Sequence, residues 1–114
     1  MLTFKQYQEL AHKTAIYPTE HFEYPVIGLA GEVGELCNQV KKIIRDDGDL
    51  LTALQSSRKA KIQDEIGDIL WYVAECCTKF ELDMEAIAEG NLEKLAKRAS
   101  EGTIHGDARG KSPE

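Results

Sequence analysis

The periodicity of apolar residues is the feature that most limits the fold of this chain. Along residues 25–45 and 57–80, apolar side chains recur every three or four positions, which is the repeat of an amphipathic α-helix. Val, Ile and Thr never alternate with polar residues over the length of a strand, so we expect no sheet. The sequence therefore predicts an all-α protein.

Capping residues and helix breakers divide the chain into four predicted helices. Thr3 and Gln6 are spaced as a capping box, and Pro25 suits the first turn of a helix. Ser57 and Asp83 are suitable N-caps for the two later helices. The helices are expected at about residues 4–14, 25–45, 57–80 and 83–99, and residues 49–56 form a connector with room for one loose turn. We expect one domain over residues 1–99 and a flexible tail over residues 100–114.

The second and third predicted helices should pack as an antiparallel pair, because both are long and only a short connector joins them. Each carries an apolar stripe that we expect to be buried. In the second helix the stripe consists of Val26, Leu29, Val33, Leu36, Val40 and Ile44. In the third helix it consists of Ile62, Ile66, Ile69, Val73, Cys76 and Phe80.

Two acidic pairs lie along the same edge of these two stripes. Glu32 and Glu35 in GEVGE, and Glu65 and Asp68 in DEIGD, are each spaced i, i+3. This spacing places the two carboxylates of a pair roughly 60° apart around the helix axis. If the stripes pack together, four carboxylates converge, and their repulsion calls for a cation between them. A hard divalent metal fits best, because only oxygen ligands are offered.

An ordinary solvated acidic edge is the alternative interpretation of these pairs. Two observations favour a metal site. Neither pair has a Lys or Arg four residues further along the same edge. Glycines, each costing about 1 kcal/mol relative to Ala inside a helix, indicate close approach of backbone or ligand; they are Gly28, Gly31, Gly34 and Gly67. A di-iron bundle would need Glu-x-x-His motifs, which are missing here, so magnesium or manganese is expected.

Composition and charge argue against several other classes of protein. The 114 residues suffice for one domain with a modest core, which oligomerisation would help to stabilise. With 30% charged residues and no apolar run long enough to cross a bilayer, we expect a cytoplasmic protein without a membrane partner. A net charge of −6 and scattered basic residues argue against binding of a nucleic-acid polymer.

Cys37, Cys76 and Cys77 continue apolar stripes and are expected to be buried thiols.

Three motifs occur in a specific order, each on a predicted helix: GLAGEVGEL at residues 28–36, DEIGDILWYV at 64–73 and NLEKLAKR at 91–98. In these motifs the chain resembles MazG-like nucleoside triphosphate pyrophosphohydrolases, of the all-α NTP pyrophosphatase superfamily. The resemblance implies a four-helix bundle-like protomer of the MazG type, completed by dimerisation as a homodimer or homotetramer. It also implies magnesium dependence, with manganese as a substitute, and hydrolysis of (d)NTPs to nucleoside monophosphate and pyrophosphate for nucleotide-pool control or house-cleaning.

The same resemblance implies roles for individual residues. The metal ligands and catalytic residues would be Glu32, Glu35, Glu65 and Asp68. The phosphates would be bound by Asn91, Lys94 and Arg98, although a solvated helix face is the alternative for the two cations. Some relatives place a further carboxylate immediately before the first motif Glu, where this chain has Gly31. The general base is then expected to be Glu35, or the metal alone suffices.

Two aromatic residues and the function itself leave alternatives open. Tyr72 lies one turn beyond Asp68 and either contacts a phosphate or is an ordinary half-buried tyrosine. Trp71 points away from the acidic edge, which suits a subunit contact better than base stacking. The alternative function is a catalytically idle helical module that binds nucleotide or protein. Retention of all four carboxylates favours the enzyme, because a scaffold would gain stability from neutralising them.

Overall fold

The computed structural model describes residues 1–102, and within them the chain is helical with no strand. Its elements are α1 (Phe4–His12), α2 (Glu23–Lys42), a π-helical turn η1 (Ile43–Asp47), α3 (Leu50–Leu54), α4 (Arg58–Lys79) and α5 (Met84–Ser100). The all-α prediction is confirmed. The four predicted helices correspond to α1, α2, α4 and α5, and α3 is the single turn of the connector. The predicted flexible tail lies almost entirely outside the described residues.

The helix termini follow the predicted capping chemistry at three of four places. Thr3 and Gln6 form the capping box of α1, and the Asp83 carboxylate accepts hydrogen bonds from the first backbone N–H groups of α5. Pro25 lies in the first turn of α2, as expected. The predicted cap of α4 is wrong. Ser57 already has helical backbone angles, so its hydroxyl makes no capping bond, and Ser56 Oγ accepts from the Arg58 N–H instead.

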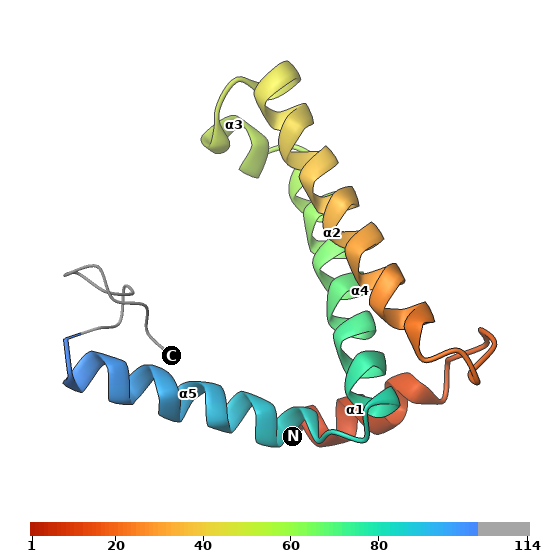
Figure 1. The fold of residues 1–114 in the computed structure, drawn as a ribbon. Helices are drawn as coiled ribbons and strands as arrows, with labels where there is room; N and C mark the ends of the chain where they lie inside the picture. The colour runs from red at the N-terminus through yellow and green to blue at the C-terminus, as the bar shows by residue number, and fades with distance from the viewer. Residues whose placement is uncertain (103–114) are drawn as a thin grey trace.

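The helices form an open V rather than a compact globule (Figure 1). One arm is the antiparallel pair α2 and α4, as predicted, with α3 at its tip. The other arm is α5. The N-terminal part of α5 packs against α1, and the rest of α5 projects away from α2 and α4. The radius of gyration is 17.4 Å, whereas a compact domain of this length would have about 13 Å. The shape leaves the inner side of the V uncovered.

The core at the corner of the V is small. The buried residues Ala11, Ala74, Cys77 and Met84 come from α1, α4 and α5, and partly buried side chains such as Leu70 and Val73 pack around them. Among residues 1–102 six hydrophobic residues are buried, whereas twenty large hydrophobic ones are exposed. Such a ratio is far from that of a stable monomer, which rarely exposes large contiguous apolar patches.

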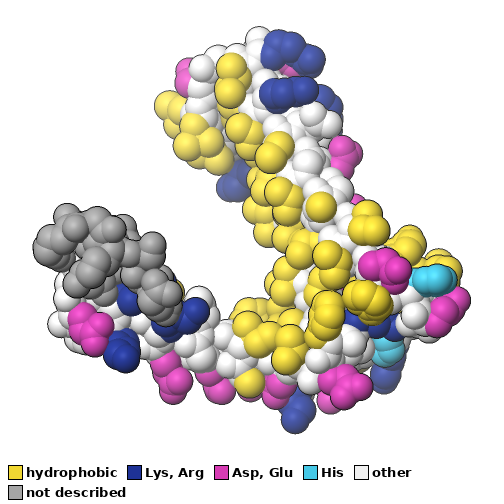
Figure 2. Space-filling view, viewed as in Figure 1, with side chains coloured by type: hydrophobic (Ala, Val, Ile, Leu, Met, Phe, Trp, Pro, Cys, Tyr) yellow, Lys and Arg dark blue, Asp and Glu magenta, His cyan; other side chains and the backbone are white. Residues whose placement is uncertain are grey.

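The predicted burial of the apolar stripes is wrong within the protomer at four of the six positions of the α2 stripe, and at Ile66 and Phe80 of the α4 stripe, which are 52% and 51% exposed. Val26, Val33, Val40 and Ile44 are 43–74% exposed, while the partly buried residues that α2 turns toward α4 include Gly28, Glu32, Leu36 and Gln39. The physical reason is rotation of α2, because the tight contact between Gly28 and the Tyr72 ring brings the edge of the stripe, not its centre, against α4. Hydrophobic side chains therefore run along the inner side of the V (Figure 2).

Two further features concern the thiols and the helices as a whole. Cys77 is buried and Cys76 is partly buried, but Cys37 is exposed, so its predicted burial is wrong for the same reason as that of the α2 stripe. Among the described residues no helix combines the length and the apolar character needed to cross a membrane.

Candidate metal centre

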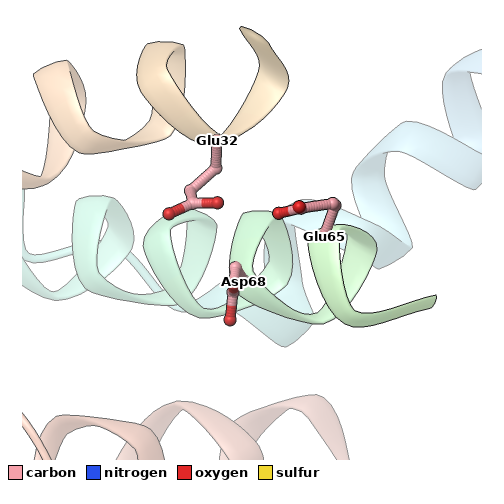
Figure 3. Close-up of side chains that lie close together, drawn as sticks. All are labelled: Glu32, Glu65 and Asp68. Atoms are coloured by element: carbon pink, nitrogen blue, oxygen red, sulfur yellow. The ribbon is translucent and has the colours of Figure 1, made fainter. Parts of the chain in front are cut away.

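Three carboxylates converge where the middle of α2 faces α4. Glu32 comes from α2, and Glu65 and Asp68 come from successive turns of α4 (Figure 3). One carboxylate oxygen from each residue lies within 4.8 Å of those from the other two. The convergence follows from the i, i+3 spacing on α4 and from the rotation of α2 that turns Glu32 toward its neighbour.

The three carboxylates repel one another, and no ion pair among residues 1–102 offsets their charge. Burial, followed by the negative charges of Asp68 and Glu65, raises the pKa of Glu32 above its ordinary value of 4.5. Glu32 and Glu65 are half-buried and Asp68 is exposed, so the group remains open to a ligand. An all-oxygen donor set of this kind suits Mg²⁺ or Mn²⁺.

Glu35, the fourth predicted ligand, lies outside this group of three. Its side chain is exposed and accepts a hydrogen bond from Asn38 Nδ2 at 3.4 Å. Its charge nevertheless contributes to the raised pKa of Glu32, which places it close to the group. Three of the four predicted carboxylates are therefore brought together, and the fourth stands beside them.

The glycines around the acidic pairs differ in what they accommodate. A Cβ atom added to Gly28 would lie 2.2 Å from Tyr72 Cε1, so this glycine permits a close ring contact. A Cβ atom added to Gly31, Gly34 or Gly67 would meet no atom of residues 1–102 within 4 Å. In the part of the chain that the structure describes, the expectation of close approach is confirmed only at Gly28. The other three leave open backbone near the carboxylates.

The basic residues predicted to bind phosphate lie on the other arm of the V. Asn91, Lys94 and Arg98 belong to α5, at and beyond the middle of a helix that projects away from the α2–α4 pair (Figure 1). Asn91 and Lys94 are exposed, and Arg98 is partly buried. Within one chain, these three residues therefore do not reach the carboxylates.

Tyr72 and Trp71 both pack within the chain. Tyr72 is partly buried against Gly28, and its ring contacts the Trp71 ring edge to face at a centroid distance of 5.0 Å. Trp71 Nε1 donates a hydrogen bond of 2.8 Å to Thr14 Oγ1. Trp71 thus joins α4 to the loop that follows α1, and its role in a subunit contact stays a prediction.

Two residues near the site had no signal in the sequence. Tyr7 on α1 is half-buried, and burial followed by the Asp68 carboxylate raises the pKa of its phenol. Glu75 on α4 is completely buried and accepts a hydrogen bond from the Tyr17 hydroxyl. Both depend on how α1 and the loop after it cross α4, which helical periodicity alone does not specify.

Comparison with known proteins places these features in a family context. Residues 22–103 match a family model described as the MazG nucleotide pyrophosphohydrolase domain. The Gene 37 protein of Mycobacterium phage L5 is 37% identical to this chain over 107 residues, which cover 88% of this chain and 91% of that protein. No solved structure gives a significant match. The family match includes α2, α4 and α5, and so all of the predicted site residues.

Proposed function

The chain belongs to the MazG nucleotide pyrophosphohydrolase family, and on that premise we propose that it hydrolyses (deoxy)nucleoside triphosphates to monophosphate and pyrophosphate with bound Mg²⁺. A role in nucleotide-pool control or house-cleaning in the cytoplasm would follow from that reaction. The observation that carries the proposal is the convergence of Glu32, Glu65 and Asp68 from two helices, with no cationic side chain paired to them among residues 1–102.

The carboxylates would hold the metal, and Glu35 would join them when its exposed side chain turns toward the group. When bound, Mg²⁺ would supply charge stabilisation to the triphosphate oxygens and lower the pKa of the attacking water. Mn²⁺ offers the same preference for oxygen ligands and can substitute. Glu35 is also the candidate for the general base, because its exposed side chain stands beside the group of three and can face an attacking water.

A second copy of the chain is part of this proposal. The apolar stripe of α2 and the inner side of α5 lie exposed on the two arms of the V, and a partner inserted between the arms would bury both. The same partner could bring its own α5 to the carboxylates, and with it Asn91 and Lys94. Positive charge would then reach the triphosphate from the second subunit, where it can stabilise the departing pyrophosphate. A homodimer satisfies this requirement, and a homotetramer is compatible with it.

Turnover of a panel of canonical and damaged (d)NTPs tests the function directly. With Mg²⁺ we expect equimolar nucleoside monophosphate and pyrophosphate, and no product when the metal is chelated. The competing hypothesis is a catalytically idle helical module, which would bind nucleotide without releasing pyrophosphate at any metal concentration. A nucleoside diphosphate as first product would exclude the proposed reaction.

A further inference from the structure

An aromatic pocket lies at the N-terminal end of α2, next to the candidate metal centre. Its walls include Tyr17, Tyr24, Trp71 and Tyr72, and its volume is about 420 Å³, which is within the range of small-molecule sites. We infer that this pocket is the nucleobase subsite of the enzyme. The inference rests on the proposed function, because the carboxylates must hold the phosphates of the same nucleotide.

The distance between pocket and carboxylates suits a single nucleotide. Tyr24 precedes Glu32 by two turns of α2, about 12 Å along the axis, and Tyr72 follows Asp68 by one turn of α4, about 6 Å. Tyr72 is itself a wall of the pocket and lies one turn beyond Asp68 on α4, so it connects the pocket to the cluster. A ligand with phosphates at the carboxylates can therefore extend its base toward Tyr24.

The pocket contains a ready platform for a flat ring. The rings of Tyr17 and Tyr24 are stacked, with centroids 4.6 Å apart and planes 2° from parallel. Tyr17 is buried, whereas Tyr24 is 44% exposed and leaves ring surface on which a further ring can stack. Aromatic platforms of this kind bind bases of any sequence through their π-faces. Trp71 meets the Tyr17 ring edge to face and closes one side of the pocket.

A buried carboxylate holds this platform in place. Glu75 has no exposed surface, accepts from the Tyr17 hydroxyl, and lies 3.1 Å from His12 Nδ1. Burial of a carboxylate is costly unless hydrogen bonds compensate for lost water. The contacts with Tyr17 and His12 compensate for the burial of Glu75. They also fix the position of the Tyr17 ring, and through the stacked pair the orientation of Tyr24.

The chemistry of the walls favours a base over the other candidate occupants. Aromatic faces offer no positive charge to a phosphate, and among residues 1–102 no Lys, Arg or His lines the pocket. An apolar side chain from a second copy of the chain could also fill the space. That occupant would leave the pocket unavailable to nucleotide, and the following experiment distinguishes the two.

Trp71 is the only tryptophan of the chain, so its fluorescence reports on this pocket. The probes are the α,β-methylene analogues of the four dNTPs, which resist cleavage, and inorganic tripolyphosphate, which has no base; all are titrated with Mg²⁺. We expect the analogues to quench Trp71 emission and tripolyphosphate to leave it unchanged while still binding by calorimetry. Equal quenching by both, or binding of the analogues without any change in emission, would overturn the inference.

Three variants locate the effect within the pocket. Tyr24→Ala should weaken binding of the analogues about tenfold, the loss expected for one stacked base, and leave tripolyphosphate affinity unchanged. Tyr24→Phe should retain wild-type affinity, because it keeps the ring. Phe22→Ala is the matched control, since Phe22 is an exposed aromatic residue of the same segment that contacts Phe80 outside the pocket.

The outcomes separate this inference from the proposed reaction. Base-dependent quenching without any pyrophosphate release would refute the reaction and leave the base subsite standing. Pyrophosphate release with the same KM in Tyr24→Ala and wild type would refute the subsite and leave the reaction standing. If no analogue binds while the dNTPs are hydrolysed, the pocket has another occupant and the inference falls.

Discussion

Removal of one charge from the carboxylate group should stabilise the protein without metal. Two charges 4.8 Å apart repel by about 0.9 kcal/mol in a water-like dielectric and about 3.5 kcal/mol at a protein surface. Because Asp68 is exposed, the lower figure is the better guide. Glu32→Gln removes two of the three repulsive pairs, so we expect apo stability to rise by about 1–2 kcal/mol, or a Tm increase of at least about 4 °C.

The assay is thermal unfolding by circular dichroism in EDTA and in Mg²⁺. Wild type should show a metal-dependent rise in Tm, because the ligand binds only the folded state. Glu32→Gln should begin from a higher apo Tm, lose most of that rise and lose most turnover. Glu93→Gln, which removes one exposed charge from α5, is the control and should leave the Tm and the metal response unchanged.

The pH dependence of apo stability gives an independent check. The folded-state pKa of Glu32 lies above its ordinary value of 4.5, so its protonated form favours the folded state. Wild type without metal should therefore lose stability as pH rises from below 4.5 through the raised pKa, and Glu32→Gln should lose less. A lower apo Tm in Glu32→Gln, with the metal response intact, would mean that the carboxylate is structural and that the site assignment is wrong.

Three further predictions concern glycines, assembly and bond cleavage. Gly28→Ala should cost about 1–3 kcal/mol, because its Cβ must displace the Tyr72 ring, whereas Gly31→Ala should add up to about 1 kcal/mol; equal effects on Tm would contradict the packing argument. Light scattering should give at least twice the chain mass of 12.7 kDa, and a stable, active monomer would refute the shared site. Hydrolysis in oxygen-18 water should label the monophosphate, and label in pyrophosphate would exclude attack at the α-phosphorus.

Much of the fold could be predicted because helix signals are local. The capping box of Thr3 and Gln6, the Asp83 cap and the first-turn Pro25 each act within one turn of the chain, and the structure has all three. The cap of α4 could not be decided this way, because Ser56 and Ser57 are adjacent and equally suitable. Which hydroxyl faces the free N–H groups depends on how the connector enters the helix.

The candidate site was predictable to the extent that its geometry lies within single helices. The i, i+3 spacing places Glu65 and Asp68 together whatever else the chain does. The relation of Glu32 to them depends on the rotation of α2, and that rotation also separates Glu35 from the group of three. The roles of Tyr7 and Glu75 depend on the crossing of α1 and its loop over α4, so no spacing within one helix could reveal them.

The exposed stripe of α2 shows what periodicity does and does not specify. A helical repeat of apolar residues records that one face is removed from water, and it contains no information about which chain covers it. Val33 and Val40 follow the repeat as closely as Leu36 does, yet Leu36 is partly buried while the other two remain exposed. The predicted phosphate-binding residues Asn91, Lys94 and Arg98 are likewise separated from the carboxylates, because they lie on α5, the other arm of the V. The proposed second copy would resolve both discrepancies at once, because a partner that covered the stripe could also deliver its Asn91 and Lys94 to the site.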